Sequence, residues 1–186
     1  MDPDELLTLV EAHLVSVFGQ DSGRASISFL GTDRIDVLRF GPDAEGLVRY
    51  ATLGMSRHPM SGSSELTTEG PRAELVLSVQ GLHDTVLRRL GALAASPAVE
   101  GVVLTAGAGL DLGESLWDGS RFTAVLVGQP GGLVPDVEDV SFLPLLPMTP
   151  NEAAWKRVHG AAALQERWLG NGTDLRDPQR KSVSLD

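Results

Sequence analysis

Hydrophobic residues in the first twenty positions recur at helical spacing. One apolar stripe runs along residues 3–18 and consists of Leu6, Val10, Leu14 and Val17. Pro3 suits the first turn of a helix, and the acidic residues beside it suit the positive end of the helix dipole. Gly19 follows the stripe directly. The pattern therefore predicts a helix over residues 3–18 that ends at Gly19.

Within residues 26–77, several short segments alternate between apolar and polar positions, as strands with one buried face do. The apolar members of this alternation are Ile27, Phe29, Ile35, Val37, Val48, Tyr50, Leu75 and Leu77. Turn-forming sequences at residues 31–33 and 41–46 are short enough for hairpins, which favours antiparallel pairing. Residues 54–71 show no such pattern. We predict a long surface loop there, and loops of this kind often carry function.

The middle of the chain indicates a second helix followed by buried strands. The helix is predicted over residues 81–96, with Pro97 expected to stop it. Apolar runs at residues 101–105, 122–127 and 140–146 are typical of strands that are buried on both faces.

The last helix opens at Thr149 and Glu152, which have the spacing of a capping box. Its buried face is predicted to consist of Trp155, Val158, Ala162 and Leu169. A polar tail follows at residues 173–186. The mixed patterning predicts one α+β domain over residues 1–172, with a mixed, largely antiparallel sheet of six or more strands flanked by about three helices.

Composition narrows the class of protein. The chain is 42% hydrophobic and 22% charged, which permits a full core and excludes wholesale disorder. It has no cysteine, so disulfides, zinc ribbons and thiol chemistry are excluded. No apolar run is long enough for a membrane-spanning helix, and the acidic N-terminus is unlike a secretory signal. We expect a cytoplasmic protein with no membrane partner.

The charge is strongly negative and unevenly distributed. The formal net charge is −10, with 9 acidic and 3 basic residues in positions 1–45 and 7 acidic and 1 basic in positions 98–139. Such a chain repels polyanions, so nucleic acid is an unfavourable partner. One explanation is that the negative charge serves only to keep the protein soluble. The alternative is that the two stretches form one acidic face for a basic protein.

No motif for a cofactor, metal or catalytic site withstands its context. The glycines between Gly107 and Gly113 lack the following helix that phosphate binding requires, so a hairpin is expected instead. The four histidines have no metal-site spacing. An enzyme of unknown class would have to use the loop at residues 56–64, where Ser56, Arg57, His58 and Glu65 are close in sequence. Nothing there positions a base against the serine.

Four ordered segments carry a family resemblance: YATLGMS at residues 50–56, RAELVL at 72–77, FLPLLPMTPNE at 142–152 and DLRDP at 174–178. Together they resemble the suppressor-of-fused-like domain family in its bacterial, single-domain form, over about residues 35–178. The resemblance implies a central sheet flanked by helices, no known catalytic activity and protein binding. It also implies a role that is proposed for bacterial relatives, immunity against a toxin encoded nearby.

Candidate binding residues follow from this resemblance and from one acidic loop. The family-motif positions are Thr52, Gly54, Ser56, Arg57, Glu74, Glu152, Asp174, Arg176 and Asp177, and the loop adds Trp117 and Asp118. Each also has a structural explanation. Gly54 suits a tight turn, and Glu74 is expected to pair with Arg49 or Arg72 within the sheet. Trp117 is either an exposed anchor for a partner or an ordinary core residue.

Overall fold

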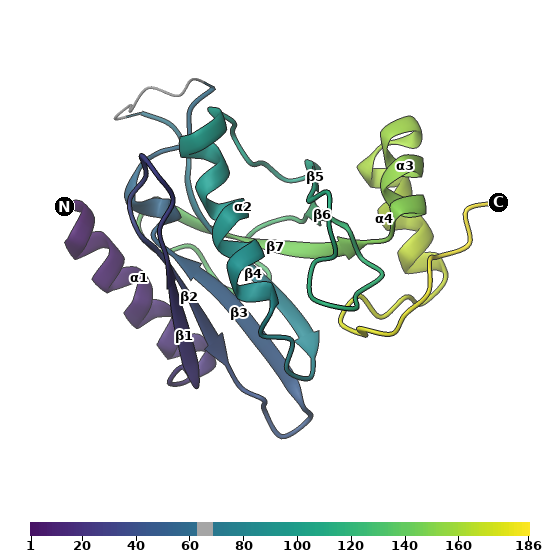
Figure 1. The fold of residues 1–186 in the computed structure, drawn as a ribbon, viewed down its shortest axis with the longest axis horizontal. Helices are drawn as coiled ribbons and strands as arrows, with labels where there is room; N and C mark the ends of the chain where they lie inside the picture. Colours follow the sequence, from purple (N-terminus) through teal and green to yellow (C-terminus); the bar gives the residue numbers. More distant parts are fainter. Residues whose placement is uncertain (63–68) are drawn as a thin grey trace.

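The computed structural model of the chain describes residues 1–62 and 69–186 and contains one seven-stranded sheet with the order β1-β2-β3-β4-β7-β6-β5 (Figure 1). The strands are β1 (Gly23–Ile27), β2 (Ile35–Phe40), β3 (Leu47–Leu53), β4 (Arg72–Gln80), β5 (Gly109–Asp111), β6 (Ala124–Val127) and β7 (Val140–Met148). Among these described strands, only the β4–β7 pair is parallel. This confirms the predicted α+β class and the mixed, largely antiparallel sheet.

Helices cover both faces of the sheet (Figure 1). They are α1 (Pro3–Phe18), the short 3-10 helix η1 (Met55–Arg57), α2 (Val86–Glu100), α3 (Pro150–His159) and α4 (Ala161–Gly170). Alternate residues of β7 separate the layers: Phe142 packs in the α1 core, whereas Leu143 packs in the α2 core. The α3–α4 pair covers the same face as α1 but at the other end of the sheet, over β6 and the end of β7 (Figure 1). Within the described residues, no helix has the length and hydrophobicity to span a membrane.

The predicted α1 is confirmed, but α2 differs from its prediction. It begins at Val86 and passes through Pro97 to Glu100. A proline inside a helix leaves the carbonyl four residues earlier without its usual amide donor. Here the Ser96 hydroxyl donates to that carbonyl, Leu93 O, at 2.6 Å. This substitute hydrogen bond explains why the helix does not end at Pro97.

The apolar run at residues 101–105 is not a strand. It is a connection that packs on the α2 core, with Leu104 only 3% exposed, so its apolar character reflects burial without strand pairing. The glycine-containing segment that follows forms the predicted hairpin, in which β5 pairs with β6.

The predicted last helix is two helices, and its predicted buried face is wrong except at Trp155, which packs against the core. Gly160 adopts φ 93°, outside the helical region, and separates α3 from α4. The break changes which side chains point at the sheet. Val158 and Leu169 are 79% and 84% exposed, whereas Leu164 and Trp168 pack in the core at 0% and 3%.

We predict that two leucines of α4 differ sharply in their contribution to stability. Leu164→Ala should lower the free energy of unfolding by about 2–5 kcal/mol, because it leaves a cavity in the core. Leu169→Ala should change it by no more than about 0.5 kcal/mol. Urea denaturation followed by circular dichroism measures both, and equal effects would contradict the break at Gly160.

Candidate protein-binding site

The carboxylate of Glu74 lies at the centre of a buried hydrogen-bond cluster that joins β3, β4 and η1. Glu74 is 0% exposed. Its oxygens accept hydrogen bonds from Thr52 Oγ1 at 2.8 Å, Gly54 N at 2.9 Å, Met55 N at 3.2 Å, Ser56 N at 2.9 Å and Ser56 Oγ. The cluster therefore unites four residues that the sequence singled out: Thr52, Gly54, Ser56 and Glu74.

The predicted ion pair of Glu74 with Arg49 or Arg72 is wrong. Arg49 Nε donates to Ser78 Oγ at 3.1 Å, and Arg72 Nε pairs with Asp139 at 3.3 Å. Neutral donors replace a cation around Glu74. Burial raises the pKa of this carboxyl, and the hydrogen bonds from Ser56, Gly54 and Thr52 oppose the rise without cancelling it.

The local sequence explains how the chain reaches this carboxylate. Thr52 Oγ1 also accepts the Leu75 amide at 2.8 Å, which ties the end of β3 to β4. Gly54 has φ 142°, and a Cβ there would lie 2.9 Å from the Arg34 carbonyl oxygen. Only glycine allows this turn. The turn directs the next two amides inward, where their buried N–H groups need acceptors.

On the outer side of this turn, the side chains of Arg57 and His58 are partly exposed, at 24% and 36%. Arg72 Nη1 fixes the turn from the other side by donating to the Ser56 and Arg57 carbonyls at 2.9 and 2.7 Å. Arg57 pairs with Asp4 at 2.9 Å, and His58 Nε2 lies 2.7 Å from an Asp33 oxygen. Beside His58, a cleft of about 440 Å³ extends to the C-terminal end of α2. The turn is thus a rigid surface feature.

This geometry does not assemble a catalytic pair. Ser56 is 0% exposed, and its hydroxyl donates to Glu74, while His58 contacts Asp33. Ser63, Ser64 and Glu65 lie outside the described residues. Across the part of the chain that the structure describes, no group of three or more acidic or histidine side chains could hold a metal ion.

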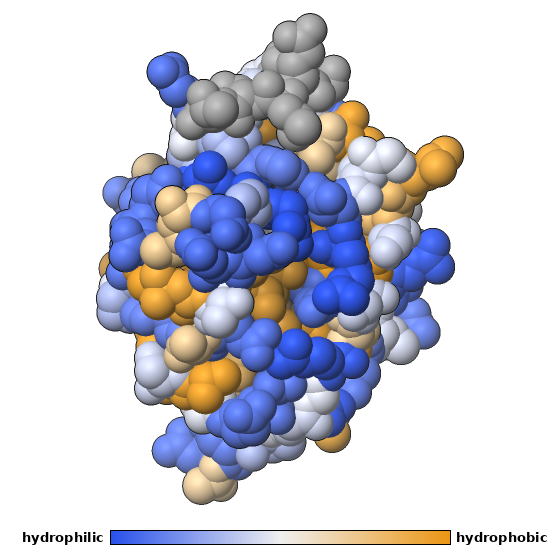
Figure 2. All heavy atoms as spheres, turned by 90° about the vertical axis from the view of Figure 1, so that its left-hand side faces the viewer, coloured by the Kyte–Doolittle hydropathy of each residue, from blue (hydrophilic) through white to orange (hydrophobic). Residues whose placement is uncertain are grey.

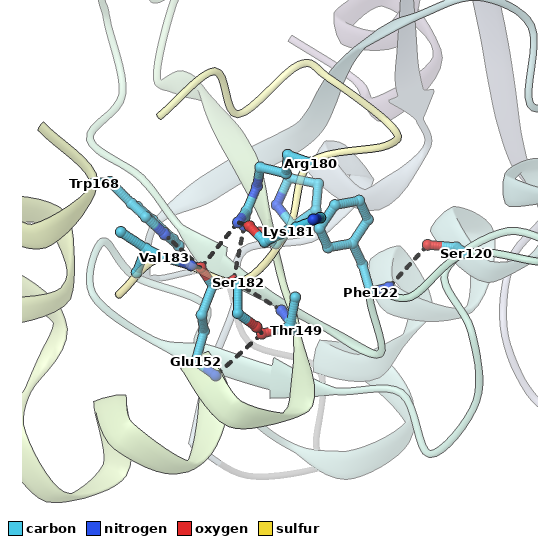
Figure 3. A network of polar contacts seen from close by, with 10 residues as sticks. Ser120, Phe122, Thr149, Glu152, Trp168, Arg180, Lys181, Ser182 and Val183 are labelled. Carbon is cyan, nitrogen blue, oxygen red and sulfur yellow. Dashed lines mark hydrogen bonds and ion pairs between the residues drawn. The ribbon is translucent and has the colours of Figure 1, made fainter. Parts of the chain in front are cut away.

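A second buried glutamate, Glu152, fixes the C-terminal tail (Figure 3). The predicted capping box with Thr149 is present. In addition, Arg180 forms a two-pronged ion pair with Glu152, at 2.8 and 2.9 Å, and also donates to the Pro147 carbonyl. Trp168 Nε1 and the Val183 amide donate to the same carboxylate at 2.9 and 3.1 Å.

The environment of Glu152 shifts its pKa in the opposite direction to that of Glu74. Burial alone would raise the pKa of Glu152, but the hydrogen bonds from Arg180, Thr149 and Trp168 outweigh it and leave the pKa lowered. Sequence analysis missed Arg180, because an arginine in a polar tail normally faces solvent. The sequence feature that could have revealed a docked tail is the pair Val183 and Leu185. These alternate apolar residues both pack on the α3–α4 core.

The remaining candidate residues lie away from the Glu74 cluster. Trp117 is 4% exposed and packs against His83 and Phe122, with ring centroids at 4.7 and 5.7 Å. It is a core residue, so it is not available as an exposed anchor. Asp118 pairs with Arg89 at 3.0 Å.

The last three candidates stabilise the start of the tail. Asp174 pairs with Arg176 at 3.4 Å, and Asp177 accepts the Gln179 amide at 2.8 Å. The Arg176 carbonyl accepts the Gln80 amide at 2.8 Å, which joins the tail to the end of β4.

Acidic residues from two distant parts of the sequence gather beside α1, and we call this surface the acidic face. Val134 of the β6–β7 connection packs in the α1 core, and His13 Nε2 lies 2.7 Å from the Pro135 carbonyl oxygen. Its acids are Asp2, Asp4, Glu5 and Glu11 at α1 and Asp136, Glu138 and Asp139 in the connection, and Arg24, Arg57 and Arg72 pair with three of them. Figure 2 shows the side on which α1 lies, where hydrophilic side chains surround small hydrophobic patches. The other acids of residues 98–139 lie elsewhere, around α2 and β5.

Comparisons with known proteins identify the fold. The family model described as Suppressor of fused protein (SUFU) matches residues 31–181. A protein described as a SUFU homologue from Neisseria gonorrhoeae FA 1090 is similar at 17% identity, with a TM-score of 0.76 over 96% of this chain and 97% of that chain. A Sufu–Fu complex is similar at 15% identity, with a TM-score of 0.67 over 95% of this chain and 91% of that chain.

The match to the crystal structure of Drosophila Suppressor of Fused has 15% identity and a TM-score of 0.64, and it covers 94% of this chain but only 50% of that chain. The present chain therefore spans half of the Drosophila protein. A search of curated protein sequences finds no match.

We predict that Glu74→Gln lowers the free energy of unfolding by about 2–4 kcal/mol, because an amide NH₂ would face buried donors that need acceptors. Ser56→Ala, which removes one of the five hydrogen bonds, should cost only about 1 kcal/mol. The matched control Glu166→Gln, on the exposed side of α4, should be neutral. Urea denaturation at pH 7 measures all three. If Glu74→Gln left the free energy of unfolding unchanged, the stabilising role of the cluster would be contradicted.

We predict that Arg180→Met lowers the free energy of unfolding by about 3–5 kcal/mol near pH 7, because it leaves the Glu152 charge buried without its cation. The pKa of Glu152 is lower in the folded state than its usual 4.5. Its stabilising effect is therefore complete above pH 4.5 and is lost as the pH falls through the lowered value. The difference between wild type and Arg180→Met should shrink in acid. Urea titrations from pH 7 downward test this, and a pH-independent difference would contradict it.

Proposed function

Because the chain belongs to the suppressor of fused family, we propose that it is a non-catalytic protein-binding domain whose partner is a basic protein. We further propose that it acts in the bacterial cytoplasm as an immunity protein, with a toxin encoded nearby as the partner. The observation that supports the basic partner is the acidic face. Support for protein binding as such comes from the relative whose structure is a Sufu–Fu complex.

The acidic face is suited to attract a positive surface. Among the described residues, ion pairs engage Asp4 with Arg57, Glu11 with Arg24 and Asp139 with Arg72. Four acids of the face, Asp2, Glu5, Asp136 and Glu138, form no ion pair within that part of the chain. Their four negative charges are part of the net charge of −10.

Such a field acts mainly on the rate of association. Long-range attraction increases the frequency of productive encounters and weakens as salt screens it, over roughly 8 Å at physiological ionic strength. The lifetime of the complex has to come from buried contacts. Because Trp117 lies in the core, it cannot supply these buried contacts with the partner. Residues at the surface supply them instead, including the rigid turn around Arg57 and His58.

We predict that neutralising the acidic face slows association with the partner. The variant Glu5→Gln, Asp136→Asn, Glu138→Gln should reduce the association rate constant for the product of the adjacent gene by about tenfold at low salt. The dissociation rate should change little. Stopped-flow mixing over a series of NaCl concentrations measures both constants.

The matched control removes the same charge elsewhere, with Glu45→Gln, Glu166→Gln and Asp186→Asn, all at exposed positions. It should retain most of the association rate. Equal slowing by both variants would show that net charge matters and the face does not. Absence of any complex with the adjacent gene product, at every ionic strength, would contradict the proposed immunity role.

A further inference from the structure

The cleft of about 440 Å³ beside His58 has the size of a small-molecule site, since such sites measure roughly 300–1,000 Å³. It lies where the β1–β2 connection and the turn after β3 meet the C-terminal half of α2, at the upper end of that helix in Figure 1. Four of its lining residues are buried and apolar: Ile35, Met55, Ala94 and Ala95 are at most 7% exposed. Apolar walls of this kind hold the hydrophobic body of a ligand.

The Asp33–His58 pair gives this cleft hydrogen-bond acceptors. His58 Nε2 lies 2.7 Å from Asp33 Oδ2. A carboxylate can only accept, so Nε2 carries the hydrogen, and Nδ1 of the neutral ring is left as an acceptor beside the carboxylate. The Thr32 hydroxyl, which also lines the cleft, donates its own hydrogen to the Phe29 carbonyl at 3.0 Å and so adds a further acceptor. Ligand atoms that pair with these groups therefore have to be donors.

Charge favours a cation at the same place. Among the lining residues that the structure describes, Asp33 is the only acid, and apart from His58 none is basic. Pro97 and Ala98 bring the C-terminal turn of α2 to the cleft. That turn contains no basic residue, so the negative end of the helix dipole is not compensated by a side chain there. Positively charged donors suit both the carboxylate and the helix end.

We infer that this cleft binds a small organic cation, an amidine, guanidine or amine carried on an apolar body. The N–H donors of the cation pair with Asp33, and the apolar body packs on Met55 and the alanines of α2. The inference goes beyond the proposed function. Neither depends on the other, because the acidic face attracts the partner protein, whereas the cleft holds the cation.

The probes are three molecules of nearly the same shape: benzamidine, which is a cation, benzamide, which is neutral, and benzoate, which is an anion. Each is titrated into the ¹⁵N-labelled chain at pH 7, and the amide signals give the dissociation constants. Benzamidine should shift signals from residues 31–35, 54–58 and 94–98. Benzamide keeps the ring and lacks the charge, so it should bind at least about fivefold more weakly. Benzoate should bind more weakly still, because Asp33 repels it.

Two matched pairs of variants locate the site. Asp33→Asn removes the charge and should weaken benzamidine binding about fivefold, whereas Asp186→Asn makes the same change outside the cleft and should stay within about twofold. Ala98→Leu fills the cleft and should weaken binding at least about fivefold, whereas Ala92→Leu changes an alanine of α2 outside the cleft and should stay within about twofold. All four positions are exposed, so the variants should fold, which circular dichroism and thermal unfolding establish.

Three results would overturn the inference: equal binding of benzamidine and benzamide, signal shifts that map away from the cleft, or unchanged binding of benzamidine by Asp33→Asn or Ala98→Leu. The adjacent gene product distinguishes a small-molecule site from a protein contact. Saturating benzamidine should leave the affinity for that protein unchanged. Displacement of the protein by benzamidine would show that the cleft belongs to the protein interface, which would overturn the inference and leave the proposed function standing.

Discussion

The buried carboxylate of Glu74 determines how the chain passes from β3 into its candidate binding surface. Three backbone amides and two hydroxyls converge on it from residues 52–56, and no cation takes part. A carboxylate offers two acceptor oxygens in one plane, which is what a turn with several inward N–H groups requires. Arg72 completes the arrangement by holding the carbonyls of the same turn. The outward positions of Arg57 and His58 follow from this.

Two buried glutamates thus hold two connections by different electrostatic means. Glu74 is surrounded by neutral donors, so burial dominates and its pKa is raised. Glu152 meets Arg180, so its pKa is lowered although it too is buried. The first glutamate fixes the turn beside α1, and the second holds the C-terminal tail against α3 and α4. The sheet carries α2 on one face, and α1 with the α3–α4 pair on the other.

Local patterns predicted the parts of the structure that local forces decide. The α1 stripe, the capping box at Thr149 and the β5–β6 hairpin each depend on residues close in sequence. Features that depend on distant partners could not be predicted. Whether Glu74 meets an arginine or folded-back amides is decided by tertiary structure, and so is the burial of Arg180. The helix continues through Pro97 because the Ser96 hydroxyl donates a hydrogen bond to the Leu93 carbonyl. The expectation that a proline stops a helix takes no account of such a side-chain donor. The family resemblance found Glu74 and its neighbours as candidates, but it did not reveal how they are joined.

Amide hydrogen exchange measures the central claim, that Glu74 holds the turn as part of the folded core. The account predicts that the Gly54, Met55 and Ser56 amides exchange as slowly as the Leu75 amide in β4, because all four are released only when the protein unfolds. In Glu74→Ala, the three turn amides should exchange quickly while the β6 and β7 amides stay protected. Fast exchange of the turn amides in the wild-type protein would contradict the account.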